Sequence, residues 1–489
     1  MQILIVVNST NEWPFDTASV EVVDAKTYLT RPEYGERRNT KVFNLCRSYR
    51  YQTLGYYVTL LATARGHKPM PNIMTLQDLK SQTVVRLVSD DLDELIQHSL
   101  QPIESDKFTL SIYFGRNLAK RYDRLSLQLF NLFQAPLIRA QFSKNGKWQL
   151  RTIAPIPLDE IPRPHKSFVL EAATEHFAGR RASVRKQKPS KYDLAILVNP
   201  EEKLPPSNGK ALAKFAKAAE SAGLRPEIIT RDDYGRLAEF DALFIRETTA
   251  VSHHTYRFAR RATMEGLVVI DDPESILKCS NKVYLAELLT KHKIRVPRTV
   301  IVQKDNLGQV STELGLPCVL KLPDAAFSQG VVKVENEVAL AEFGERYLAK
   351  SDLVIAQEFL PTTFDWRIGI FDREPFYACK YHMVTDHWQI TKSDEHGHRR
   401  YGRTETLPVQ QAPRQAVSMA LKAANLIGDG LYGVDVKQVD NQCYIIEVND
   451  NPNIDCGVED DFLKDELYDR LMEAFLERIE RKKAGVRSA

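Results

Sequence analysis

The sequence lacks every pattern that would place the chain across a membrane. None of its apolar runs approaches about 18 residues, the length that a membrane-spanning helix needs. The opening residues, MQILIVVNST, are apolar, but no basic segment precedes the run and Asn8 interrupts it. We therefore interpret them as a first β-strand rather than a signal peptide, and we expect no membrane partner.

Paired cysteines and a strong net charge are also missing. The 489 residues contain six cysteines, at positions 46, 279, 318, 379, 443 and 456, and no two of them form a CxxC pair. This spacing does not suggest a disulfide framework and favours a reducing compartment, so we expect a cytoplasmic protein. The net charge of +3 gives no general case for nucleic acid as a partner. One basic stretch, residues 179–191, lacks interleaved aromatics and reads as a linker, with an anionic-partner patch as the alternative.

What the sequence does contain is alternating strand and helix patterns over several segments. A chain of this length predicts two to four domains. Residues 1–165 read as an α/β domain, and residues 166–191 read as a linker. Residues 192–278 alternate at βαβ spacing, which predicts a small parallel sheet. Short strands with polar loops follow, and an amphipathic helix ends the chain, so we expect a multidomain α/β and α+β protein.

Two segments near the C-terminus predict a β-hairpin with acids on its polar face. They are GVDVKQV, 433–439, and CYIIEVNDN, 443–451, and side chains alternate faces along each strand. A three-residue loop, 440–442, would bring the two apolar faces together. It places Asp435 opposite Glu447, with Asn449 two residues further on. The apolar pairs would be Val434 with Val448 and Val436 with Ile446.

Opposed carboxylates repel each other across a hairpin, and a cation between them is the simplest compensation. Ligands that are all oxygen suit Mg²⁺ or Mn²⁺ rather than zinc, and Mg²⁺ held by few protein groups usually also holds substrate phosphates. The alternative is a solvated hairpin whose acids face water. The register, the amides and the Asn451-Pro452 turn favour the metal site.

Two further stretches could hold a nucleotide. Lys321 ends a predicted strand before a small polar loop, 322–330, whose backbone N–H groups could close over phosphates while the lysine supplies charge. In DLVIAQEFLP, residues 352–361, backbone groups could contact an adenine edge between apolar neighbours. The alternatives are an ordinary hairpin and a core strand that runs into a turn.

Two other stretches carry anion-binding side chains. In FDWRIGIF, Arg367 shares a face with Asp365 and suits bidentate binding of a carboxylate or phosphate. The basic loop DEHGHRRYGR, 394–403, contains Arg399 and Arg400, which could clamp anions. An exposed Asp/Arg face and a mobile surface loop are the respective alternatives. The two histidines of this loop have no third His or Cys nearby, so we discount zinc there.

Taken in order, these motifs resemble the ATP-grasp superfamily. The resemblance covers about 190–489 and rests on Lys282, Lys321 with its loop, QEFL, DWRIGI and GVDV…YIIEVNDNPNID. The segment from ALFIRETT to LAELL resembles the glutathione-synthetase and RimK-type ligases. SIYFGR and APLIRAQF in the first 160 or so residues resemble the domain fused in front of RimK-like ATP-grasp proteins. The resemblance implies a pre-ATP-grasp domain at 192–278 and ATP-grasp lobes at 279–350 and 351–489.

The resemblance also implies roles for individual side chains. The ATP phosphates would contact Lys282 and Lys321. The adenine would lie against Gln357, Glu358, Phe359 and Leu360, with Asp365 near the nucleotide or the substrate. Two Mg²⁺ ions, or Mn²⁺ in their place, would be held by Asp435, Glu447 and Asn449. The carboxylate substrate and the transferred phosphate would contact Arg367, Arg399 and Arg400, and the substrate side would include Arg246 and Asn451.

The implied reaction is ATP-dependent amide formation between a carboxylate and an amine through an acyl phosphate. The product would carry an added amino acid, such as glutamate, on a small molecule, a peptide or a protein tail. Two other classes stay open: an ATP-binding regulatory protein without turnover, and a phosphotransferase with a hydroxyl acceptor. Related ligases are commonly dimers or tetramers, so we also expect a homo-oligomer.

Overall fold

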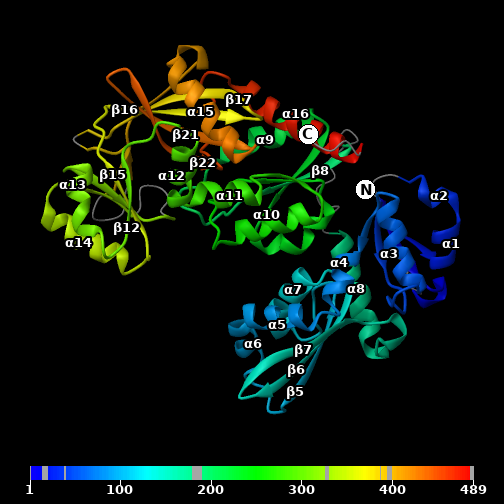
Figure 1. Cartoon of the computed structure of the whole chain (residues 1–489). Coiled ribbons are helices and arrows are strands. Elements are labelled where there is room, and N and C mark those ends of the chain that lie inside the picture. The colour runs from blue at the N-terminus through cyan, green and yellow to red at the C-terminus, as the bar shows by residue number, and fades with distance from the viewer. Residues whose placement is uncertain are drawn as a thin grey trace. The chain divides into compact units, whose positions relative to one another are not determined.

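The computed structural model of the chain describes residues 2–13, 20–37, 40–178, 190–324, 330–385, 387–393 and 399–484. It divides into two compact units (Figure 1). The first comprises residues 1–191 and 232–239, and the second comprises residues 192–231 and 240–489. No helix within the described ranges combines the length and apolar character that crossing a membrane requires.

The first unit begins with a parallel sheet in the order β2-β1-β3-β4. Its strands are β1 (Gln2–Val7), β2 (Glu21–Asp24), β3 (Thr40–Asn44) and β4 (Lys68–Met70). The helices of this part are α1 (Ala25–Thr30), α2 (Pro32–Gly35), α3 (Leu54–Ala64), α4 (Ile73–Asp78), α5 (Gln82–Asp91) and α6 (Asp93–Leu100). Most residues of its first and third strands are buried, as is usual in parallel sheets.

A second, antiparallel sheet completes the first unit. It contains β5 (Lys107–Tyr113), β6 (Leu137–Asn145) and β7 (Lys147–Pro155), with α7 (Asp123–Leu132) between the first two strands. Gly146 joins β6 to β7 at a φ of 74°, a conformation that favours glycine. An Asn-Gly pair favours such a hairpin turn, and β6 and β7 pair on either side of Gly146.

Helix α8 (Lys166–Ala178) corrects part of the predicted linker at 166–191. Val169, Ala172, Ala173 and Phe177 are buried in the same apolar core as the antiparallel sheet. Their spacing is that of one helix face, so the segment gains more from packing than it would from serving as a solvated linker. Residues 179–189, which include most of the basic stretch, lie outside the described residues.

The second unit begins with another parallel sheet, in the order β11-β10-β8-β9. Its strands are β8 (Tyr192–Leu197), β9 (Leu224–Ile229), β10 (Ala242–Ile245) and β11 (Val268–Ile270). Its helices are α9 (Gly209–Ser221), α10 (His254–Met264) and α11 (Pro273–Ser280). All three strand pairs are parallel, which confirms the βαβ interpretation of this segment.

The parallel sheets of the two units follow the same plan. In each, the second strand flanks the first on one side, and the third and fourth strands follow on the other. Helices α3 and α10 begin at positions 54 and 254, and strands β4 and β11 begin at positions 68 and 268. Gly66 and Gly266 end the two helices with φ values of 71° and 80°. The chain therefore contains two copies of one four-stranded parallel sheet, one in each compact unit.

Two antiparallel sheets form the rest of the second unit. The first, in the order β12-β15-β13-β14, contains β12 (Thr299–Val302), β13 (Cys318–Lys321), β14 (Val331–Val334) and β15 (Val354–Glu358). The second, in the order β20-β17-β16-β21-β22, contains β16 (Phe364–Phe371), β17 (Glu374–His382), β20 (Thr404–Leu407), β21 (Leu431–Val439) and β22 (Gln442–Asp450). A short pair, β18 (Thr391–Ser393) and β19 (Arg399–Tyr401), lies between β17 and β20 in sequence.

Helices cover these sheets with their apolar faces. The helices are α12 (Lys282–Lys291), α13 (Val310–Leu314), α14 (Glu337–Leu348), α15 (Arg414–Ile427) and α16 (Asp465–Lys483). We predicted that Leu463, Leu467, Leu471 and Phe475 form the apolar face of the last helix. The last three are fully buried in the core that also contains Phe215 of α9, whereas Leu463 precedes the helix and is partly buried.

The hairpin of β21 and β22 confirms the acid pair but corrects the loop. The turn has two residues, Asp440 and Asn441, with φ values of 47° and 62°, as in the tight turns that match strand twist. A bulge leaves Ile446 without a direct partner, so Val436 pairs with Ile445 and not with Ile446. Beyond the bulge the register returns to the predicted one, and Asp435 lies opposite Glu447.

Candidate functional site

The polar face of this hairpin gathers the three predicted oxygen ligands. Asp435 and Glu447 are direct partners across β21 and β22, and Gly433 pairs with Asn449. The Asn449 Nδ2 atom lies 3.3 Å from Asp435 Oδ2. The sheet therefore brings two carboxylates and an amide together on one surface, and this all-oxygen donor set fits Mg²⁺.

Two cationic side chains from other elements contact the same acids. Lys282, at the start of α12, places Nζ 2.8 Å from Glu447 Oε1. Arg367, on the neighbouring strand β16, donates from Nη2 to Asp435 Oδ2 at 2.9 Å and also from Nε to Oδ1. Asp435 and Arg367 are direct partners in the sheet. Positive charge thus offsets the repulsion between the two carboxylates.

The two carboxylates respond differently to this environment. Burial raises the pKa of Asp435, and the attraction of Arg367 offsets only part of that rise. Burial acts in the same direction on Glu447, but the charge and hydrogen bond of Lys282 outweigh it, so the pKa of Glu447 is lowered. Glu447 is therefore the acid that stays ionised most readily.

Lys321, the second lysine of the site, lies at the end of β13. Its Nζ donates to Gln357 Oε1 at 2.7 Å, and Gln357 Nε2 donates to Thr299 Oγ1 at 3.0 Å. Burial lowers the pKa of Lys321 to about 8. This ammonium group has only partial compensation from neighbouring acids, so it is well suited to receive an anion.

A cavity lies between these lysines and apolar residues. Lys282, Lys321 and Gln357 supply its polar lining. Its apolar lining is formed by Leu285, Ala286, Leu289, Val296, Ile355, Ile445 and Ile446. Ile446 reaches the cavity because the bulge in β22 turns it away from the buried face. An apolar slot with a few polar groups is the usual form of a small-molecule site.

The remaining residues predicted near the nucleotide lie on adjacent strands. Asp365 on β16 accepts hydrogen bonds from Lys437 Nζ at 2.7 Å and from Thr362 Oγ1 at 3.0 Å. Lys437 was not predicted as a site residue, although the period of two places it on the same face of β21 as Asp435.

The QEFL segment has contacts of its own. Glu358 ends β15 and binds Arg298, whose Nε lies 2.8 Å from Glu358 Oε2. The ring of Phe359 lies under Lys333 Nζ at 4.6 Å and meets Trp388 edge to face. Leu360 is half-buried. These contacts fix the segment beside Gln357 and leave its role toward adenine a prediction.

Arg246 and Asn451 join two distant segments. Arg246 is 1% exposed, and it donates to Asn451 Oδ1 at 2.7 Å, to Pro452 O at 2.9 Å and to Ser207 Oγ at 3.0 Å. Asn451 in turn donates from Nδ2 to Glu247 O at 2.6 Å and has a φ of 45°. In this arrangement both side chains are engaged with protein groups, and they hold the turn after the acid-bearing strand.

Some predicted residues lie outside what the structure describes. The side chains of Arg399 and Arg400 are among them, although their backbone forms β19. Residues 325–329 of the predicted phosphate loop and residues 394–398 with both loop histidines also lie outside the described residues. Their roles therefore stay predictions.

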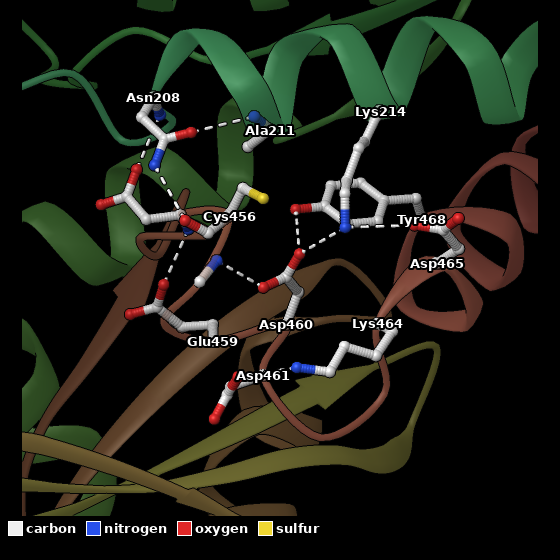
Figure 2. A network of polar contacts seen from close by, with 12 residues as sticks. Asn208, Ala211, Lys214, Cys456, Glu459, Asp460, Asp461, Lys464, Asp465 and Tyr468 are labelled. Atoms are coloured by element: carbon white, nitrogen blue, oxygen red, sulfur yellow. Dashed lines mark hydrogen bonds and ion pairs between the residues drawn. The ribbon is translucent and has the colours of Figure 1, made fainter.

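A polar network fixes the segment that follows the turn (Figure 2). Asp460, 2% exposed, accepts from Lys214 Nζ at 2.9 Å, from Tyr468 Oη at 3.0 Å and from Gly457 N at 2.6 Å. Burial raises the pKa of Asp460, but these hydrogen bonds outweigh it and lower the pKa. The network joins α9 to α16 and so supports the turn at 451–455.

We expect Asp460→Asn to destabilise the folded chain by about 2 kcal/mol, because a buried amide cannot replace all three accepted hydrogen bonds. Urea denaturation of the full chain measures this. The matched control is Asp461→Asn, whose exposed ion pair with Lys464 should contribute less than about 0.5 kcal/mol. Since the pKa of Asp460 is lowered by folding, the difference from wild type should shrink as the pH falls below about 4. Equal effects of the two variants would contradict this account.

Comparison with known protein families matches two segments of the chain. A family described as RimK-like ATPgrasp N-terminal domain matches residues 25–172, and one described as RimK-like ATP-grasp domain matches residues 279–462. The second match includes the acid-bearing hairpin, both lysines and Arg367. The first match includes the parallel sheet after β2, the antiparallel sheet and the first part of α8.

Similar curated proteins are amino-acid ligases. The chain is 27% identical over 255 residues to an alpha-aminoadipate–LysW ligase, LysX, of Sulfolobus acidocaldarius. The match covers 50% of this chain and 85% of that relative. It is 26% identical over 233 residues to a probable alpha-L-glutamate ligase of Vibrio vulnificus, covering 47% and 74%.

Solved structures give more distant similarities. A D-alanine–D-alanine ligase of Bacillus anthracis matches with a TM-score of 0.47 and 15% identity, covering 60% of this chain and 99% of that one. A RimK domain protein of Sphaerobacter thermophilus matches with a TM-score of 0.43 and 15% identity, covering 58% and 98%.

Proposed function

We propose, on the premise that this chain belongs to the RimK-like ATP-grasp proteins and is an ATP-dependent carboxylate–amine ligase, that it adds an amino acid such as glutamate to a carboxylate acceptor. The acceptor would be a small molecule, a peptide or the tail of a protein. The observation that carries the proposal is the row of Asp435, Glu447 and Asn449 beside Lys282 and Arg367.

The three oxygen ligands would hold two Mg²⁺ ions, with Mn²⁺ as a substitute, and such ions neutralise charge on the β- and γ-phosphates. Lys282 and Arg367 offset the negative charge of the same acids that would bind the ions. Bound metal ions would neutralise these acids, and both cationic side chains could then contact phosphate oxygens. Lys321, half-buried and only partly compensated, would supply a further positive charge beside the nucleotide.

The nucleotide base would occupy the apolar part of the cavity. Leu289, Ile355 and Ile445 offer the flat apolar contact that an adenine ring needs. The backbone of residues 357–360, with Asp365 on the next strand, would provide the polar edge. This arrangement puts the phosphates near the two lysines, which line the same cavity.

The reaction then proceeds in two displacements. A carboxylate oxygen of the acceptor attacks the γ-phosphorus, and the bond to the bridging oxygen of ADP breaks. The amine then attacks the acyl carbon, loses a proton, and inorganic phosphate leaves. Arg367, with Arg399 and Arg400, would hold the negative charge that passes through these steps. No side chain acts as a nucleophile, so positioning and exclusion of water carry the catalysis.

The first test is release of inorganic phosphate from MgATP with pools of amino acids and short peptides. We expect release that needs both a carboxylate acceptor and an amino acid, because the amine step completes turnover. Mass spectrometry of the product would show the added residue. Transfer of phosphate to a hydroxyl compound would instead establish a phosphotransferase, and tight ATP binding without turnover in any pool or with any peptide would favour a regulatory protein.

A further inference from the structure

A second cluster of side chains that can bind a metal lies at the carboxyl end of β10. It shares no residue with the row of Asp435, Glu447 and Asn449, here called the oxygen row. Glu247 follows β10, and His253 and His254 stand at the start of α10. One ligand atom of each residue lies within 4.8 Å of the other two.

Glu247 is a buried acid, and only one of its two carboxylate oxygens is hydrogen-bonded to the described residues. The residue is 1% exposed, and its Oε2 atom lies 2.9 Å from His254 Nε2. Its Oε1 atom is buried and takes part in no hydrogen bond with the described residues. Burial of an unpaired carboxylate oxygen costs free energy unless a cation or a hydrogen-bond donor contacts it.

Each ring nitrogen of His253 has a polar neighbour: Nδ1 lies beside Thr255 and Nε2 lies beside Glu247. Thr255 Oγ1 donates its single proton to Thr248 O at 3.4 Å. His253 Nδ1 lies 3.2 Å from the same hydroxyl and can donate to it. In the tautomer with the proton on Nδ1, the lone pair of Nε2 faces Glu247 Oε1 at 3.9 Å. Two acceptors face each other across a gap, and a cation between them resolves the repulsion.

We propose that Glu247, His253 and His254 form a binding site for a zinc-type dication. Two imidazoles and one carboxylate suit Zn²⁺, whereas Mg²⁺ prefers oxygen ligands alone. Bonds of about 2.0–2.1 Å in a tetrahedral site separate ligand atoms by roughly 3.3 Å. The separations of 2.9 and 3.9 Å bracket that value. The hydrogen bond from His253 Nδ1 to Thr255 is the outer contact that orients a metal-binding imidazole.

Three protein ligands leave a tetrahedral ion one open position, which a water or a nitrogen or carboxylate donor would fill. The backbone of Glu247 adjoins the turn after the oxygen row, because its carbonyl accepts from Asn451 Nδ2 at 2.6 Å. Thr249 Oγ1 also donates to Asp450 Oδ2 at 2.6 Å. The open position would therefore lie in the same unit as the proposed ligase site and close to its acid-bearing strand.

The N-terminal copy of the sheet shows that the fold does not require these ligands. Thr53 precedes α3 and Leu54 begins it, where His253 and His254 stand at α10. Leu45 N bonds to Val6 O as Arg246 N bonds to Leu197 O, so Cys46 stands where Glu247 stands. The first copy has the same strand order and helix start without the three ligands. The histidines therefore serve something other than the fold of this unit.

The test is a titration of the full chain, freed of metal and without nucleotide, with Co²⁺ followed by competition with Zn²⁺. We expect one equivalent of Co²⁺ with the visible absorption of a tetrahedral site, displaced by Zn²⁺. His253→Gln and His254→Gln should each weaken Zn²⁺ binding by about tenfold or more, and Thr255→Val should weaken it by about tenfold through the lost orienting bond. The matched control is His292→Gln, whose ring bonds its own helix at Leu288 O and should leave binding unchanged.

The proposal is overturned if no stoichiometric band appears, or if the band survives both His253→Gln and His254→Gln. Thermal melts of each variant separate a lost site from a lost fold, and His253, 40% exposed at its side chain, is the safer of the two substitutions. Because metal binding is measured without ATP, its failure leaves the ligase proposal standing. Glu447→Gln, which affects the ligase site, should leave Co²⁺ binding at this cluster intact.

Discussion

Glu447→Ala is expected to lower the turnover of MgATP by about 10³-fold or more, because it removes the carboxylate best suited to hold a metal ion at the phosphates. Glu447 faces Asp435 across the hairpin, and its pKa is lowered despite burial because Lys282 binds it. Its loss leaves one acid and one amide, too few protein ligands to hold the metal ions that would neutralise the charge of the transferred phosphoryl group. Steady-state phosphate release with the acceptor and amine identified in the pool screen measures the effect.

The matched control for this variant is Glu374→Gln, an exposed carboxylate at the start of β17 in the same sheet. It should retain turnover within about twofold, since a surface charge away from the site contributes little. Thermal melting checks that Glu447→Ala stays folded, because the variant also leaves Lys282 without this ion pair. Turnover near the wild-type rate in a folded Glu447→Ala protein would exclude the oxygen row as the metal site.

Lys321→Met is expected to lower kcat/KM for ATP by about 10²-fold, since one preorganised charge on a phosphate is commonly worth that much. The wild-type enzyme should also show a fall in kcat/KM above pH 8. The pKa of Lys321 is lowered to about 8 by burial, so the ammonium is charged below that pH and neutral above it. Loss of the charge weakens binding of the nucleotide, and kcat/KM reports the titration in the free enzyme.

Lys321→Arg separates this titration from other effects of pH. Guanidinium keeps its charge through the alkaline range, so the variant should lose the fall above pH 8 even if its absolute rate is lower. Lys304→Met, an exposed lysine after β12, is the matched control and should keep both the rate and the pH profile. A wild-type profile that stays flat to pH 10, or a fall that persists in Lys321→Arg, would remove Lys321 from the phosphate site.

Local patterns were enough to identify the acid-bearing hairpin and the elements around it. Alternation along 433–439 and 443–451 predicted that Asp435 faces Glu447, and the structure confirms this pair. The predicted loop was nevertheless wrong. A two-residue turn and a bulge at Ile446 reach the same register as a three-residue loop. Both solutions bury the apolar face, and alternation alone cannot distinguish them because a bulge changes the period within one strand.

Helix α8 shows a different limit. Its buried residues, from Val169 to Phe177, have helical spacing that was readable in the sequence. The neighbouring basic stretch drew the whole segment 166–191 into a linker, although charge and proline describe only its second half. Periodicity, which reports packing against a core, was the stronger signal of the two.

The sequence by itself determined much of the order of strands and helices and the pairing of Asp435 with Glu447 on one hairpin. Each of these follows from residues close together in the chain, where side-chain period and turn chemistry act directly. Only the tertiary structure decided which distant groups meet. It paired Lys282 with Glu447 and Arg367 with Asp435, buried Arg246 against Asn451, and brought Glu247 to His253 and His254. Such contacts depend on how sheets and helices pack against one another, and no local period records that packing.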